Sequence, residues 1–286
     1  MNLHNDIFTL RQNMKKSDFE CYYYKNDAPL TIPFHQHEFF EVFFFLSGNV
    51  SYVIEGKMYQ LRAGDILLTN NLDIHKPIVK SGKKYERYVL WINPKFLTEL
   101  NKLDCNLTSC FHDSSEKKYK LIRPDVTTLS NLKHIFEKML KNRDNREMGS
   151  NILLNAYLME FLVYLNRAYF ATPDSICHDI TENKKINQIV SYVNTHYQEE
   201  LSLDIICENF YISKSHLTYL FKAYTGLTLY QFIIKKRLTV AKNMLIQNKP
   251  VMQTCIDCGF TDYSNFLKAF KREFGLNPKE ISKQAK

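Results

Sequence analysis

The stretch SHLTYLFKAYTGL, residues 215–227, decides the fold because it returns as SNFLKAFKREFGL at residues 264–276. The two copies lie 49 positions apart (264 − 215) and share the pattern S-x-[LF]-x-x-x-F-K-x-x-x-G-L. Two copies are too few for a repeat solenoid. They indicate one small helical unit that occurs twice.

Each copy predicts a helix with a defined start and end. Ser213 and Asp262 stand where a side-chain oxygen accepts the free N–H groups of a first helical turn. Gly226 and Gly275 stand where a left-handed residue ends a helix. Both helices therefore have local signals at each boundary.

A shorter apolar stretch and a turn precede each predicted helix, at residues 203–209 and 251–258. A short helix, a turn and a second helix with a polar outward face form a helix-turn-helix, which places its second helix in the major groove of DNA. The sequence predicts two such units, joined by a helix over residues 228–247.

Anchor residues keep their spacing across both units, in the order Arg237-x3-Ala241-x2-Met244-Leu245, Cys258-Gly259-Phe260-x-Asp262-x-Ser264-x-Phe266-x-Lys268-x-Phe270-Lys271 and Phe274-Gly275-x2-Pro278. This pattern resembles the DNA-binding domain of AraC-type bacterial regulators, over about the last hundred residues. The resemblance implies binding to double-stranded operator DNA. We expect Lys222 and Lys271 to contact phosphates, which position a protein without specifying sequence. The residues expected to contact bases are Ser215, Thr218, Tyr219, Tyr263, Ser264 and Lys268.

The excess of basic residues gathers in the last third of the chain. Residues 184–286 hold 15 Lys and Arg against 8 Asp and Glu, a net charge of +7 (15 − 8). The first 183 residues hold 23 basic (38 − 15) and 22 acidic residues (30 − 8), a net charge of +1. A polyanion-binding module requires such an excess, so the charge supports DNA as a partner.

The seven cysteines are odd in number and scattered, which argues against a disulfide framework and for a reducing cytoplasm. Cys255 and Cys258 form a C-x-x-C pair, but no second pair completes four zinc ligands. The first ten residues lack the apolar region of a signal peptide. The longest apolar run, 39–46, is far shorter than the ~20 residues of a membrane helix. We expect a cytoplasmic protein without membrane contact.

Residues 18–92 read as short strands separated by glycine turns, which predicts a sandwich or small barrel. The expected strands are 39–46, 50–54, 57–61, 66–69, 74–79 and 85–92.

Four residues of metal-ligand type lie in these strands: His35, His37, Glu41 and, after Gly64, His75. Their spacings resemble the two sequence boxes of cupins, whose metal site has three histidines and one glutamate. The resemblance implies a cupin-like jelly-roll barrel. Three interpretations of the quartet stay open: a divalent metal site, a pocket that hydrogen-bonds a small polar effector, or side chains satisfied by one another and by solvent. In AraC-type regulators, the corresponding opening of the sensor barrel binds the effector.

Residues 127–141 and 150–170 carry apolar residues at helical spacing, too many for one face against solvent. We expect these helices to pack on the barrel and to offer a face to a second subunit. The polar segment 171–183 is the expected linker. The predicted domains are 1–170 for effector binding and dimerisation (barrel about 18–92, helices about 94–170) and 184–286 for DNA binding.

These features predict a multidomain, homodimeric transcription regulator and not an enzyme. Its expected partners are operator DNA, a small-molecule effector such as a sugar, and RNA polymerase if the protein activates. The only cofactor indicated is the divalent metal of the first interpretation. The alternative is a metal-dependent cupin enzyme with an accessory DNA-binding tail. No further acid, base or nucleophile pattern accompanies the quartet to support that alternative.

Overall fold

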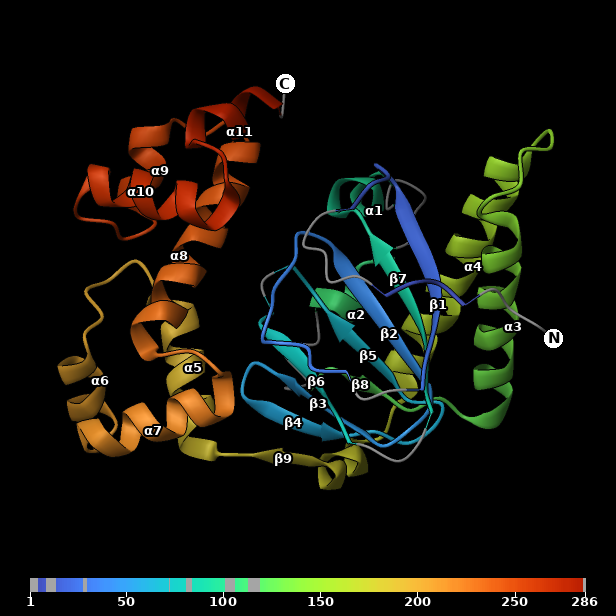
Figure 1. The fold of residues 1–286 in the computed structure, drawn as a ribbon, viewed down its shortest axis with the longest axis horizontal. Coiled ribbons are helices and arrows are strands. Elements are labelled where there is room, and N and C mark those ends of the chain that lie inside the picture. Colours follow the sequence, from blue (N-terminus) through green and yellow to red (C-terminus); the bar gives the residue numbers. More distant parts are fainter. Residues whose placement is uncertain are drawn as a thin grey trace. The chain divides into compact units, whose positions relative to one another are not determined.

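The computed structural model describes residues 5–8, 14–27, 30–71, 73–80, 84–100, 106–112 and 119–284. The chain divides into two compact units, Met1–Thr181 and Glu182–Lys286. The first unit combines strands with helices, and the second unit consists of helices (Figure 1). No helix within the described ranges is long and apolar enough to cross a membrane.

The first unit contains two sheets, with strand orders β1-β7-β2-β5-β8 and β6-β3-β4-β9. The predicted strands 50–54, 66–69 and 85–92 are confirmed to the residue. The strands are β1 (Phe19–Asn26), β2 (Phe40–Ser47), β3 (Val50–Ile54), β4 (Lys57–Gln60), β5 (Ile66–Thr69), β6 (His75–Val79), β7 (Tyr85–Ile92), β8 (Leu121–Ile122) and β9 (Ile180–Glu182). The helices are α1 (Pro94–Leu100), α2 (Ser109–His112), α3 (Val126–Asn142) and α4 (Ser150–Ala171).

Strand β2 is apolar along most of its length because both of its sides are buried. Phe40, Val42 and Phe44 pack in a cluster with residues of α3 and α4. Phe43 and Phe45 belong to a second cluster, which also takes in residues of β3 and β4. Successive residues of a strand point to opposite faces. The five-stranded sheet therefore has the two long helices on one face and the barrel interior on the other.

The segment predicted as a linker, 171–183, is ordered in the structure. It holds a 3-10 helix (Asp174–Asp179) and strand β9, which adds to the edge of the four-stranded sheet. Ile176 is buried in the barrel cluster, and Arg62 binds the Asp179 carboxylate at 2.8 Å. The burial of Ile176 and the Arg62–Asp179 ion pair therefore attach this segment to the barrel. Its polar composition had suggested a linker instead.

The second unit consists of helices, and α8 joins its two halves (Figure 1). Its capping box at Thr228 and Gln231 fixes the start of α8. Leu238, Ala241 and Leu245 of this helix pack into the core of the second half. The helices are α5 (Lys184–His196), α6 (Leu203–Asn209), α7 (Lys214–Thr225), α8 (Leu229–Ile246), α9 (Val251–Asp257), α10 (Tyr263–Phe274) and α11 (Pro278–Gln284).

The predicted boundaries of α7 and α10 are confirmed. The side chain of Ser213 accepts from the His216 N–H, and that of Asp262 accepts from the Asn265 N–H. At the other ends, Gly226 and Gly275 adopt left-handed φ values of 75° and 71°. Each repeat therefore folds as one capped helix.

The C-x-x-C pair belongs to the core of the second half. Cys255 and Cys258 are buried, and burial raises the pKa of the Cys258 thiol to about 12. A thiolate, the form that binds metal, is disfavoured there. The pair serves packing, and Cys258 Sγ lies 3.8 Å from Met244 Sδ.

Candidate nucleic-acid interface and effector pocket

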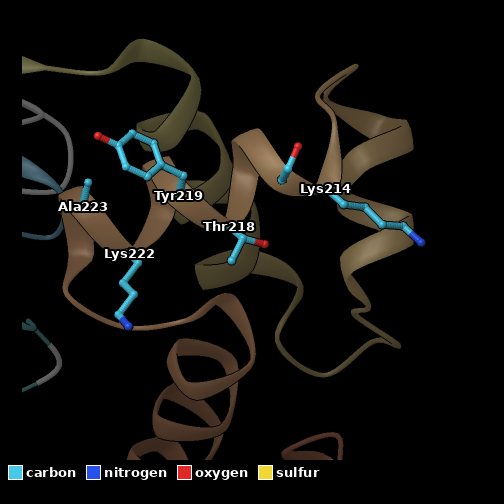
Figure 2. A pocket seen from close by; sticks show the side chains of 6 residues that line it. Lys214, Thr218, Tyr219, Lys222 and Ala223 are labelled. Carbon is cyan, nitrogen blue, oxygen red and sulfur yellow. The ribbon is translucent and has the colours of Figure 1, made fainter.

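Helix α7 presents one polar face to solvent. Ser215, Thr218, Tyr219 and Lys222 recur at the spacing that puts residues on one side of a helix. All four are exposed, and Tyr219 keeps 73% of its surface accessible. They line an open hollow together with Lys214 and Ala223, where the Tyr219 ring and the Lys222 chain project clear of the helix (Figure 2).

Helix α10 exposes a different set of groups. Ser264, Lys268 and Lys271 are exposed, as predicted. Tyr263 is half-buried, and its ring centroid lies 6.3 Å from that of Phe266 in the core. Its role in base contact stays a prediction, with only part of its side chain open to a partner.

Three exposed lysines, one on α7 and two on α10, can bind an anion. Among the described residues, Lys222, Lys268 and Lys271 form no ion pair. Other lysines of the second unit are neutralised locally, in the pairs Lys214–Asp204, Lys235–Glu273 and Lys249–Asp257. Three cations without an ion pair among the described residues therefore lie on α7 and α10, the two helices predicted to meet DNA.

The segment after α5 connects the two helix-turn-helix units. Arg237 of α8 donates from Nε to the Tyr197 carbonyl and from Nη2 to the Glu199 carbonyl, both at 2.7 Å. Gly259, in the second turn, has φ of 80°, and a Cβ there would lie 2.6 Å from the Gln198 carbonyl oxygen. Only glycine fits this approach. One backbone segment thus contacts both α8 and the second turn.

The predicted quartet meets inside the barrel. His35, His37, Glu41 and His75 are buried and line one pocket or, for His75, contact its lining. The ring centroids of His35 and His75 lie 4.3 Å apart, and His37 Nε2 lies 3.6 Å from Glu41 Oε2. One ligand atom each from His37, Glu41 and His75 falls within 4.8 Å of the others. His35 lies outside that group of three.

Backbone contacts set the histidine tautomers. Nδ1 of His37 lies 2.9 Å from the Phe39 carbonyl, and Nδ1 of His75 lies 3.0 Å from the Asp73 carbonyl. A carbonyl only accepts, so each Nδ1 carries the proton and each Nε2 the lone pair. Burial, followed by the charge of His35, lowers the pKa of His37 to about 3, so its ring is neutral.

Glu41 is the carboxyl of this cluster. Burial raises its pKa to about 7, against the opposing hydrogen bond from Trp91. Trp91 Nε1 donates to Glu41 Oε2 at 2.7 Å, across the β2–β7 register. Two imidazole lone pairs and a carboxyl fit a divalent cation. They fit hydrogen-bond donors of a small ligand equally well, so the metal and effector interpretations stand beside the third, in which the side chains satisfy one another.

Among the pocket residues that the sequence analysis missed are two polar ones of β7, Tyr85 and Arg87. Both share the parity of Trp91 along β7, and alternation would have placed them on the same side of the strand. Arg87 was overlooked because a charged residue within a strand usually faces solvent.

Two family models match the chain, one for each unit's sequence. Residues 16–162 match the AraC-like ligand binding domain, and residues 206–284 match a helix-turn-helix domain. An effector-binding domain followed by a DNA-binding domain defines a ligand-controlled transcription regulator. The first match alone spans 147 of 286 residues (162 − 16 + 1). The chain belongs to the AraC family, and it is a DNA-binding transcription regulator controlled by a small-molecule effector.

Individual relatives match most of the chain. The HTH-type transcriptional activator RhaS of Enterobacter sp. (strain 638) is 26% identical over 254 residues, 87% of each chain. RhaS of Salmonella heidelberg is 25% identical over the same share. Among solved structures, an apo ToxT variant from Vibrio cholerae covers 96% of this chain and all of its own, with 17% identity and a TM-score of 0.42.

Proposed function

We propose that α7 and α10 both enter the major groove of operator DNA. The observation that carries this proposal is the exposed row on α7, together with three lysines on α7 and α10 that form no ion pair with the part of the chain that the structure describes. Hydroxyl and phenol groups at the start and middle of α7 suit base edges. Lys222 and Lys271 suit phosphates. The remaining base contacts come from Tyr263, Ser264 and Lys268.

The length of α8 supports simultaneous contact by both units. Its 18 residues span about 27 Å at 1.5 Å per residue. Successive major grooves recur on one face of a duplex every ~34–36 Å. Helices carried near the two ends of α8 can therefore reach adjacent grooves.

In this proposal the barrel holds the effector beside His37, Glu41 and His75, and the effector is a small polar molecule, such as a sugar or its acid. The protein acts as a regulator in the bacterial cytoplasm and catalyses no reaction. It forms a homodimer through α4, which exposes Ile152 and Phe170. Where it activates, its further partner is RNA polymerase.

Selection of operators from a random-sequence library by the purified full chain tests this function. We expect enrichment of two short boxes one helical turn apart, and weaker binding by Lys222→Ala and Lys271→Ala. Enrichment of no sequence contradicts the function. Metal analysis of the same preparation distinguishes the barrel interpretations: stoichiometric metal that is lost in His37→Ala favours the metal site.

A further inference from the structure

Strand β7 places an arginine inside the barrel. Arg87 is only 2% exposed, yet it lines the same pocket as His37. Tyr85 and Val89, its alternate neighbours along β7, belong to the interior cluster. The guanidinium is therefore a positive charge enclosed largely by aromatic side chains.

Within the described ranges, Arg87 makes no direct ion pair with a carboxylate. Nη1 donates to Asn26 Oδ1 at 2.7 Å, whereas Nη2 is buried with no hydrogen-bond partner in the part of the chain that the structure describes. No ion pair within those ranges includes Arg87. Glu41 lines the same pocket, and its charge acts on Arg87 through space without a direct ion pair between the two among the described residues. A buried charge with no direct ion pair and an unfilled N–H donor is costly, so this group favours an anionic partner.

Aromatic rings hold the guanidinium but leave Nη2 without an acceptor. Cζ of Arg87 lies 4.1 Å from the Tyr85 ring centroid and 4.9 Å from those of Tyr24 and Phe8. Rings stabilise the faces of a guanidinium, whereas its N–H groups need acceptors in the plane. The Tyr85 hydroxyl is also buried without a hydrogen-bond partner among the described residues. The Arg87 Nη2 group and the Tyr85 hydroxyl can therefore both donate a hydrogen bond to an acceptor atom of a ligand.

We propose that the barrel binds a small carboxylic acid, whose carboxylate accepts hydrogen bonds from Arg87 Nη2 and the Tyr85 hydroxyl. This inference rests on the proposed function, in which the barrel holds the effector, and it names the chemical class of that effector. A carboxylate is planar and anionic, so it supplies both the missing acceptor and the missing countercharge.

The size of the pocket favours short acids. Its enclosed volume is about 30 Å³, and a site needs roughly 10–15 Å³ to hold one water. That space holds about two to three waters, so the carboxylate group itself fits, and each added carbon requires some movement of the walls. A longer acid requires the lining side chains to move outward.

Matched acids and neutral analogues test the inference on the full chain. The probes are glycolate with ethylene glycol, L-lactate with propane-1,2-diol, D-glycerate with glycerol, and D-glucuronate with D-glucose, all at constant ionic strength. Trp91 is the only tryptophan of the chain and lines the pocket, so its fluorescence reports on this site. We expect at least one acid to change the fluorescence and raise Tm, while its neutral analogue does neither.

Three results overturn the inference. One is binding of a neutral analogue as tightly as its acid. Another is the failure of every acid in the set. The third is binding of inorganic phosphate with no binding of any acid, which assigns the pocket to a tetrahedral anion.

Variants locate the charge that is responsible. Arg87→Gln should weaken the acid about tenfold or more, because a hydrogen bond to a charged group is lost. Arg87→Lys keeps the charge and should keep the preference for acid over neutral analogue. Arg62→Gln is the matched control, because Arg62 lies outside the pocket and already binds Asp179. Equal acid affinity in Arg87→Gln and wild type contradicts the assignment. If Arg87→Gln does not fold, the inference is tested by Arg87→Lys and by the comparison of each acid with its neutral analogue on the wild-type chain.

Operator binding separates this inference from the function on which it rests. If an acid binds through Arg87 without changing operator affinity, the carboxylate site stands and effector control through it fails. If a neutral compound alters operator affinity equally in wild type and Arg87→Gln, effector control stands and the carboxylate inference fails.

Discussion

The two units of this regulator keep their polar functional groups in opposite places. In the barrel, His37, Glu41 and Arg87 are buried, and their hydrogen bonds run to other parts of the fold. On α7, Tyr219 and Lys222 are exposed. A buried polar group that loses its partner costs desolvation free energy. An exposed group can be removed with little effect on folding. Substitutions in the barrel should therefore change stability, and those on α7 and α10 should change DNA binding alone.

The largest expected contrast is in the free energy of unfolding. Trp91→Phe removes the donor to Glu41 in the buried pocket and should cost about 1–3 kcal/mol. Tyr219→Phe removes a hydroxyl from an exposed ring and should cost about 0.5 kcal/mol or less. Urea unfolding followed by circular dichroism measures both. An equal loss of unfolding free energy in the two variants would contradict the expectation that buried polar groups contribute more to stability than exposed ones.

Base recognition should depend on exposed side chains of both helices. Tyr219→Ala and Lys268→Ala should each change the preferred sequence within one box, by about 1–3 kcal/mol of discrimination for a good base contact. An operator library measures the preference for each variant. If Lys268→Ala weakens all sequences alike, Lys268 contacts the backbone instead.

Phosphate contacts should give a smaller and uniform loss. Lys222→Ala and Lys271→Ala should each weaken binding to every sequence and reduce the salt slope by about one unit. Titrations over a salt series measure the slope. Lys249→Ala is the control, because Lys249 is paired with Asp257. A slope that stays at the wild-type value places the lysine away from the phosphates.

The last prediction concerns pH, on which His37 and Glu41 act in opposite directions. The pKa of His37 falls from 6.5 to about 3 on folding, so the unfolded chain binds the extra proton and stability is lost as pH falls below about 6.5. The pKa of Glu41 rises from 4.5 to about 7, so stability is lost as pH rises through that window. The stability advantage of wild type over His37→Gln should therefore shrink from pH 7 to pH 4.5, measured by urea unfolding with EDTA present. A constant advantage contradicts a buried neutral His37.

Sequence-based prediction succeeded where the signals are local. Ser213 and Asp262 cap their helices within three residues of the groups that they bind, so the repeat predicted α7 and α10 closely. The burial of Tyr263 was not foreseen, because it depends on contact with Phe266 in the core.

The pocket was foreseen only in part. The spacing of His35, His37, Glu41 and His75 predicted their convergence, since the cupin-like arrangement brings these strands together. Arg87 was missed because its environment comes from rings on other segments, including Tyr24 of β1 and Phe8. Such long-range neighbours appear only once the barrel is assembled.

The central claim is that both helix-turn-helix units of one chain contact DNA. Hydroxyl-radical footprinting of the full chain on a selected operator tests it most directly. The account predicts two protected boxes per subunit, about one helical turn apart on one face of the duplex, with Lys222→Ala and Lys271→Ala weakening protection at different boxes. A single protected box per subunit, unaffected by Lys271→Ala, would contradict it.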